Sequence, residues 1–180
     1  MILVSGMPGA GKSTFADYLA SQMNIPLVSY DKILSKEWDI LKSHLPDLAH
    51  QFFWFFGETV MKSKLPLIMD YCFHPQSCAQ LDIFTSQYGY KTITIHFDAD
   101  IDIVYKRFIE RNKNANQERH IGLIEDVDYE KFSEFAKLNK YFSFGEYRII
   151  VNTNDFSKVS YENIKNQTDM LVKELNNTAV

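Results

Sequence analysis

The fold is decided by a short stretch near the start of the chain, Gly6-Met7-Pro8-Gly9-Ala10-Gly11-Lys12-Ser13-Thr14. This stretch matches the pattern G-x-x-x-x-G-K-[ST], which is typical of a phosphate-binding P-loop. The apolar run 1–5 before it is expected to be a buried strand, and residues 15–22 after it carry apolar side chains at helical spacing. A strand, a glycine-rich loop and a helix in this order are the context that the motif requires. The sequence therefore predicts a nucleotide-binding site.

Each part of the loop has a physical role in holding phosphates. Glycines let the backbone adopt positive φ angles and approach a ligand closely. The N–H groups of the loop and the positive end of the following helix then point at the same anion. Lys12 can reach the β- and γ-phosphates, and the Ser13 hydroxyl can bind Mg²⁺. The predicted nucleotide-binding residues are Gly6, Met7, Pro8, Gly9, Ala10, Gly11, Lys12, Ser13 and Thr14.

Composition limits the class of protein. The 180 residues suit a single domain, and 46% hydrophobic with 23% charged residues is ordinary for a globular protein. The formal net charge of −4 argues against an extended nucleic-acid-binding surface. Cys72 and Cys78 have no metal-site pattern around them and suit a reducing compartment. Because no targeting segment and no apolar run of ~20 residues is found, we expect a cytoplasmic protein without a membrane partner.

Strand-like and helix-like segments alternate along the chain. We expect strands at about residues 2–6, 26–29, 67–70, 91–97 and 147–152. We expect helices at about 12–22, from 32 onward, and at 46–64, 76–87, 100–111, 129–142 and 160–176. This alternation predicts an α/β fold of three layers, a five-stranded parallel sheet with helices on both faces. Ligands bind such sheets beyond the carboxyl ends of the strands.

Two carboxylates follow predicted strands at this edge of the sheet. Asp31 comes directly after the second strand, and Asp70 ends the third. A carboxylate near an attacking hydroxyl can accept its proton, and another can support a metal ion. The alternatives are that Asp31 caps the helix that follows it and that Asp70 is a turn residue at the end of a strand.

With these residues, the chain resembles the P-loop kinases of the group that contains polynucleotide kinase, zeta-toxin kinases and chloramphenicol phosphotransferase, the AAA_33-like ATP-binding proteins. The resemblance covers nearly the whole chain, although the P-loop is its one highly specific motif. It implies a fold like that of nucleoside monophosphate kinases, with a lid, and it implies ATP and Mg²⁺. It also implies that Asp31 accepts the proton of the substrate hydroxyl and that Asp70 supports Mg²⁺.

Two absences favour a kinase over other P-loop proteins. Tyr71 follows Asp70 at the position where hydrolytic P-loop ATPases often place a water-activating Glu. The chain also lacks an Asn-Lys-x-Asp sequence and an Asp-x-x-Gly sequence after a strand, which disfavours a GTPase. ATP is therefore the expected nucleotide, although spacing alone leaves GTP open.

Three arginines follow the fourth predicted strand. Arg107 and Arg111 lie one helical turn apart and share a face, and Arg119 lies beyond them in a polar segment. The resemblance implies that a lid at about residues 112–125 closes over ATP, with arginines that reach the transferring phosphate or flank the adenine. The alternative is a solvated helix face on which they pair with acidic neighbours. The family also places adenine-contacting backbone just after the fifth strand, here residues 151–154.

The insert at about residues 32–64 is where kinases of this fold bind the phosphate acceptor. In its second helix we expect one wide apolar face toward the core, formed by Leu45, Leu48, Ala49, Phe52, Phe53, Phe55, Phe56 and Val60. Trp54 and Met61 are expected on another face, beside His50 and Glu58. There they could line an acceptor pocket, mediate a dimer contact or lie on the surface. A pocket would suit a flat or apolar acceptor such as a nucleoside, an aromatic antibiotic or a nucleotide sugar.

We therefore expect an ATP- and Mg²⁺-dependent kinase that phosphorylates a hydroxyl of a small molecule. Lys12 would hold phosphates, Ser13 and Asp70 the metal ion, and Asp31 would take the proton. The lid arginines Arg107, Arg111 and Arg119 would stabilise the transferring group. Two alternatives share these residues: a polynucleotide 5′-hydroxyl kinase, which the acidic net charge disfavours, and an ATP-binding regulatory module without turnover. The acceptor and the oligomeric state stay open.

Overall fold

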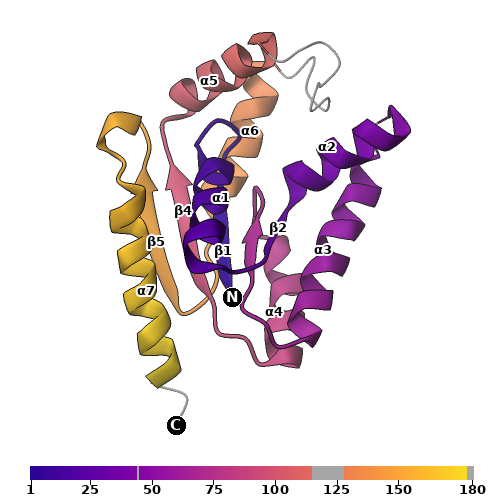
Figure 1. Cartoon of the computed structure of the whole chain (residues 1–180). Coiled ribbons are helices and arrows are strands. Elements are labelled where there is room, and N and C mark those ends of the chain that lie inside the picture. Colours follow the sequence, from indigo (N-terminus) through magenta and orange to yellow (C-terminus); the bar gives the residue numbers. More distant parts are fainter. Residues whose placement is uncertain (44, 115–127, 178–180) are drawn as a thin grey trace.

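Five parallel strands form one sheet at the centre of the molecule (Figure 1). The computed structural model describes residues 1–43, 45–114 and 128–177. The strands are β1 (Ile2–Gly6), β2 (Leu27–Ser29), β3 (Ile68–Asp70), β4 (Ile93–Asp98) and β5 (Tyr147–Asn152). Their order across the sheet is β2-β3-β1-β4-β5, and every pairing is parallel. The predicted three-layer α/β fold is confirmed, and the strands lie close to the expected positions.

Helices fill the crossovers between the strands. They are α1 (Lys12–Met23), α2 (Tyr30–Leu41), α3 (Pro46–Lys62), α4 (Ser77–Tyr88), α5 (Ile101–Asn114), α6 (Tyr129–Lys140) and α7 (Tyr161–Asn177), with a 3-10 turn η2 (Phe156–Lys158). Local signals explain several of the ends. Pro46 occupies the first turn of α3, Gly89 ends α4 in the left-handed conformation, and the Asp128 carboxylate accepts a hydrogen bond from the Lys131 N–H at the start of α6.

Two clusters of apolar side chains cover the two faces of the sheet. Successive residues of a strand point to opposite faces. Accordingly, Ile2 and Val4 of β1 pack in one cluster with Phe15 of α1, while Leu3 packs in the other with Phe53 of α3. All five are fully or almost fully buried. The strand β1 and its P-loop are thus fixed between two packed layers. No helix in the described part of the chain is both long and apolar enough to cross a membrane.

The insert between β2 and β3 consists of α2 and α3, which lie side by side along one edge of the sheet (Figure 1). Our prediction for the apolar face of α3 is correct for Ala49 and Phe53 and wrong for several of the other residues. The residues of α3 that are buried are Ala49, Phe53, Gly57 and Met61. By contrast, Phe52, Phe55 and Phe56, which we expected in the core, have exposed fractions of 40, 58 and 45%.

Close backbone packing at Gly57 explains which face of α3 is buried. A Cβ atom at this position would lie 2.7 Å from the terminal methyl carbon of Met69, a residue of β3. The glycine therefore lets the helix approach the strand, and the residues one turn before and after it, Phe53 and Met61, are buried with it. Trp54 is half-buried and packs its ring against those of Phe53 and Phe73. Met61 belongs to the core and not to a pocket.

Candidate active site

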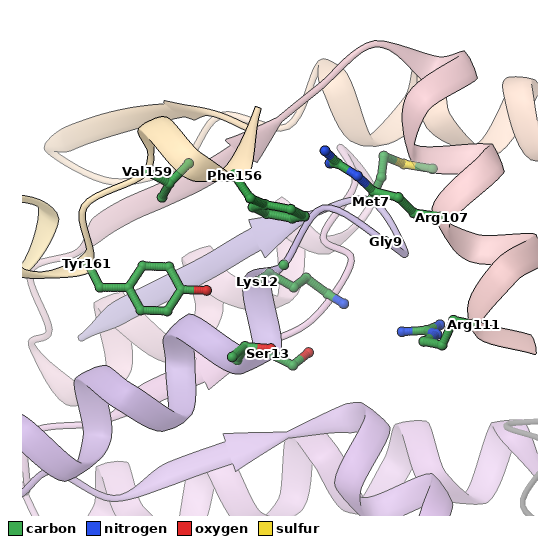
Figure 2. A pocket seen from close by; sticks show the side chains of 11 residues that line it. Met7, Gly9, Lys12, Ser13, Arg107, Arg111, Phe156, Val159 and Tyr161 are labelled. Atoms are coloured by element: carbon green, nitrogen blue, oxygen red, sulfur yellow. The ribbon is translucent and has the colours of Figure 1, made fainter. Parts of the chain in front are cut away.

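A cavity of about 550 Å³ opens above the P-loop (Figure 2). Six of the residues predicted to bind the nucleotide line it: Met7, Gly9, Gly11, Lys12, Ser13 and Thr14. Arg107 and Arg111 of α5 line the opposite wall, and Phe156, Val159 and Tyr161 close one end. Because β1 is the central strand, the loop lies where segments from both halves of the sheet meet.

Glycine is required at two positions of the loop. Gly9 and Gly11 have φ angles of +88° and +87°, which L side chains rarely adopt. A Cβ atom at Gly9 would lie 2.8 Å from the carbonyl oxygen of Val104, and one at Gly11 would lie 2.7 Å from the Phe156 ring. The backbone therefore packs closely against α5 and η2 and leaves the space above the loop for a ligand.

Lys12 is buried, and its surroundings keep it charged. Its exposed fraction is 4%, and its Nζ lies 3.6 Å from Oδ2 of Asp31. Burial works to lower the pKa of Lys12, but the nearby carboxylates of Asp31 and Asp70 outweigh it and raise that pKa above its ordinary value. A charged ammonium at the base of this cavity is suited to an anionic ligand.

Asp70 presents an unpaired oxygen to the site. Its exposed fraction is 1%, and its Oδ2 accepts a hydrogen bond of 2.8 Å from the Ser29 hydroxyl. Its Oδ1 is buried without a hydrogen-bond partner among the described residues. Burial raises the pKa of Asp70, and Lys12 and the hydroxyls of Ser29 and Ser13 offset this only in part. A buried carboxylate oxygen near a hydroxyl fits Mg²⁺, which prefers oxygen ligands.

Asp31 lies in the first turn of α2, and Ser29 is the residue that precedes this helix in the capping position. The alternative role of Asp31 as the helix cap is therefore wrong. Its side chain is 32% exposed and forms an ion pair with Lys12. The carboxyl ends of β2 and β3 thus bring Asp31 and Asp70 to the same lysine, as expected for residues that follow parallel strands.

The two described arginines of the predicted lid region have different surroundings. Arg107 donates hydrogen bonds to the carbonyl oxygens of Thr153, at 2.7 Å, and Asn154, at 3.0 Å. Its guanidinium also stacks on Phe156, 4.1 Å from the ring centroid. Arg111 points into the cavity on the side of Lys12 (Figure 2), and its charge acts on the pKa of Lys12. Arg107 therefore ties α5 to the loop after β5, whereas Arg111 remains directed at the phosphate site.

Part of the predicted site lies outside the described residues. This applies to Arg119 and to positions 115–125 of the predicted lid at 112–125. The segment 151–154, predicted to contact adenine, contains the carbonyls that Arg107 binds.

Sequence reasoning missed several residues of the site. Phe156, Val159 and Tyr161 line the cavity, although they lie far along the chain from the P-loop. The one sequence signal is their position: they follow β5, and the backbone just after this strand was predicted to contact the adenine base. Cys72 was interpreted as a plain thiol, but it lies against Lys12, and burial raises its pKa to about 11, so the thiol is neutral.

A second hollow, of about 800 Å³, lies between α2, α3 and β2. Its lining is mainly apolar and includes Ile40, Leu48, Phe52 and Phe56. None of the predicted catalytic or nucleotide-binding residues lines this hollow. It is therefore separate from the site built around Lys12.

Comparison with known proteins agrees with the fold and the P-loop. Residues 1–126 match the model of the AAA_33 family, described as an AAA domain. The chain belongs to this family. The matched part contains the P-loop, Asp31 and Asp70 of this AAA_33 protein, so the predicted membership of the P-loop kinase group is confirmed. No curated protein matches the sequence.

Solved structures share the fold of this AAA_33 protein at low sequence identity. A candidate kinase from Chloroflexus aurantiacus is 20% identical, with a TM-score of 0.78 over 94% of this chain and 96% of that chain. A gluconokinase from Sinorhizobium meliloti is 13% identical, with a TM-score of 0.60 over 99% and 97%. Kti12 from Chaetomium thermophilum in complex with ADP-AlF3 is 12% identical, with a TM-score of 0.63 over 93% and 96%.

Proposed function

We propose that this protein is an ATP- and Mg²⁺-dependent kinase that transfers the γ-phosphoryl group to a hydroxyl of a small molecule. The observation that carries the proposal is the convergence of Asp31 and Asp70 on the buried ammonium of Lys12. One carboxylate is buried with an unpaired oxygen, and the other is partly exposed. A phosphate, a metal ion and an incoming hydroxyl would each find a suitable group there.

The donor half of the reaction is assigned to the cavity above the P-loop. The loop amides and Lys12 would bind the β- and γ-phosphates of ATP. The base would lie toward the loop that follows β5, which Arg107 holds through two carbonyl oxygens. The fold shared with Kti12, whose structure contains ADP-AlF3, supports a nucleotide in this cavity.

Ser13 and Asp70 would hold Mg²⁺. When bound, the ion would neutralise charge on the phosphates and so favour attack by an oxygen nucleophile. Asp70 suits this role because its Oδ1 lacks a partner among the described residues while Oδ2 is fixed by Ser29. The Ser29 hydroxyl thereby orients the carboxylate before the ion arrives.

The chemical step assigns a separate role to Asp31. The acceptor oxygen attacks the γ-phosphorus, and the bond from that phosphorus to the oxygen that bridges the β- and γ-phosphates breaks. The hydroxyl proton passes to the Asp31 carboxylate, which is near Lys12 and partly open to solvent. The products are a phosphate monoester and ADP, and Arg111 would stabilise the charge on the transferring group.

The gluconokinase and the candidate kinase with the same fold support a small-molecule acceptor. The net charge of −4 points the same way, because polynucleotide binding depends on basic surfaces. A polynucleotide 5′-hydroxyl kinase and a non-catalytic ATP-binding module remain the alternatives that an experiment should separate.

The test is ADP release from Mg²⁺-ATP against nucleosides, antibiotics, sugars, nucleotide sugars and a 5′-hydroxyl oligonucleotide, with the phosphorylated product identified by mass spectrometry. Stimulation by a small molecule that Asp31→Asn abolishes is the expected result. Stimulation by the oligonucleotide alone would indicate the polynucleotide alternative. ATP binding without acceptor-dependent ADP release across the panel would indicate a binding module.

A further inference from the structure

Four aromatic rings gather beside Asp31, and we call them the aromatic wall: Tyr30, His50, Tyr71 and His74. They come from α2, α3 and the segment after β3. Tyr71 lies in the middle, with ring centroids 5.0 Å from Tyr30, 5.8 Å from His50 and 6.3 Å from His74. Each of these residues is half-buried. Tyr30 adjoins Asp31 in the chain, so the wall begins next to the carboxylate to which the acceptor hydroxyl would pass its proton.

Tyr30 and His50 of the wall are polar but uncharged at neutral pH. Trp54 Nε1–H donates a hydrogen bond of 3.0 Å to Nε2 of His50, which leaves the proton of the neutral ring on Nδ1. Burial and the neighbouring His74 lower the pKa of His50, with a smaller opposite effect from Asp47. Burial, together with the nearby Asp31, raises the pKa of Tyr30 to about 12. The wall therefore offers ring faces and neutral hydrogen-bond donors.

The acceptor side of the molecule lacks the residue that most often binds anionic substrates. A carboxylate or phosphate group is commonly held by arginine, whose forked donors match its two oxygens. This sequence has four arginines, and residues 1–106 contain none of them. Two lysines of the insert, moreover, are paired elsewhere: Lys32 with Asp17 of α1, and Lys62 with Glu58 at 3.2 Å.

Negative charge, by contrast, acts on the wall from two carboxylates. Asp31 follows Tyr30 directly in the chain and raises the pKa of its hydroxyl, and Asp47 acts on the pKa of His50 from the same helix, so both carboxylates lie within electrostatic range of the rings. A negatively charged acceptor would be repelled here, whereas an uncharged one would not. The positive charge of Lys12 is already engaged by Asp31 and faces the P-loop cavity.

We propose that the acceptor is an uncharged alcohol whose ring packs on the aromatic wall, and that phosphorylated and carboxylated compounds are rejected. The proposal rests on the proposed kinase function, because it concerns the acceptor of that reaction. Aromatic surfaces favour flat or apolar rings, and the N–H of His50 and the Tyr71 hydroxyl would provide hydrogen bonds to neutral oxygens, whereas the Tyr30 hydroxyl donates to the Pro46 carbonyl oxygen.

The test uses pairs of alcohols of which one is uncharged and the other anionic. Suitable pairs are 4-(hydroxymethyl)benzamide with 4-(hydroxymethyl)benzoate and each nucleoside with its 3′-monophosphate, which keeps the 5′-hydroxyl, with ADP release and product mass as readouts. We expect kcat/KM to be at least ~10-fold higher for the uncharged member of every pair that reacts. Equal or faster reaction of a charged member, or no reaction of any uncharged member, would overturn the proposal. If a charged member reacted as fast or faster, the proposed kinase function would stand and only the acceptor preference would be wrong. If none of the alcohols and not the 5′-hydroxyl oligonucleotide gave a product, the kinase function and the acceptor preference would both be wrong.

Variants connect the preference to the wall. His50→Leu removes the neutral donor, and we expect KM for the reactive uncharged alcohol to rise ~10-fold while the Kd of ATP stays unchanged. Phe55→Leu is the matched control, because Phe55 lies on the same helix with an exposed fraction of 58%. An unchanged KM in the His50 variant, or an equal change in the control, would contradict the assignment of the wall.

Discussion

The carboxylate of Asp31 lies 3.6 Å from the ammonium of Lys12, and this pair joins the two halves of the site. Lys12 belongs to the P-loop, which lines the cavity, and Asp31 lies in the first turn of α2, the helix that contributes Tyr30 to the aromatic wall. The carboxylate that we propose as the proton acceptor is thereby held beside the lysine of the P-loop.

Replacement of Asp31 by Asn should separate catalysis from nucleotide binding. We expect kcat to fall by about 10²–10⁴-fold, the usual contribution of a general base, with the Kd of ATP changed only a few-fold. The measurement is kcat by ADP release and Kd by titration calorimetry. Asp17→Asn is the control, because Asp17 is an exposed carboxylate whose partner is Lys32. Equal losses in kcat and in ATP affinity would contradict the role of Asp31 as base.

Asp70 should make stability depend on pH in an unusual direction. Burial raises its pKa in the folded state above the ordinary value of 3.8, so the folded protein holds the proton more tightly than the unfolded chain does. The stability from this group is present below about pH 4 and is lost as the pH rises through the raised pKa. We expect the Tm of the ligand-free wild type, relative to that of Asp70→Asn, to decrease as the pH is raised from about 4 toward 8.

The metal has the opposite requirement, because Mg²⁺ binds the ionised carboxylate. Adding Mg²⁺ and ADP should therefore raise the Tm of the wild type more than that of Asp70→Asn. A pH-independent Tm difference, or equal stabilisation of both proteins by Mg²⁺-ADP, would contradict the assignment of Asp70.

Gly11 of the P-loop and Gly89 at the end of α4 both have positive φ angles, so their replacement by alanine separates the effect of backbone strain from that of a close contact. Gly11→Ala places a Cβ atom 2.7 Å from the Phe156 ring, whereas Gly89→Ala meets nothing within 4 Å. Both substitutions carry the cost of a positive φ, about 1 kcal/mol. We expect only Gly11→Ala to weaken ATP binding, by ~10-fold or more, as measured by calorimetry. Similar affinities in the two variants would show that the contact with Phe156 is unimportant for the nucleotide.

The two arginines of α5 should affect different kinetic constants. Arg107→Lys loses the two-carbonyl contact with the loop after β5, so the Kd of ATP should rise ~10-fold with little change in kcat. Arg111→Lys should instead lower kcat, by ~10-fold or more, because Arg111 faces the phosphate site. Kinetics at saturating ATP, together with calorimetry, measure both constants. A higher Kd of ATP in Arg111→Lys together with a lower kcat in Arg107→Lys would show that the two assigned roles are reversed.

The sheet and the position of the carboxylates could be predicted because they follow from short-range patterns. The P-loop is a local motif, and parallel strands put the residues that end them, such as Asp70, at one edge. Phe156 and Tyr161 are harder to predict, because they reach the cavity from η2 and the start of α7, far along the chain, and only their position after β5 indicates it. Nothing in their local sequence indicates the ligand.

The orientation of α3 could not be predicted for a different reason. The apolar face of this helix is so wide that periodicity does not indicate which part of it meets the sheet. The buried face is the one on which Gly57 lies close to Met69 of β3. This contact depends on the position of a neighbouring strand, which the residue pattern of α3 alone does not reveal.

Core substitutions in α3 test this orientation directly. Phe53 is fully buried, and its truncation to Ala should lower the free energy of unfolding by about 3–5 kcal/mol. Phe55, with an exposed fraction of 58%, should tolerate the same change within about 0.5 kcal/mol. Denaturant unfolding measures both values, and Phe53→Leu provides a milder variant if Phe53→Ala does not fold. If α3 buried its whole wide apolar face, the two truncations would lower the free energy of unfolding by similar amounts. We expect a large difference because, of the two residues, only Phe53 lies on the face that meets β3.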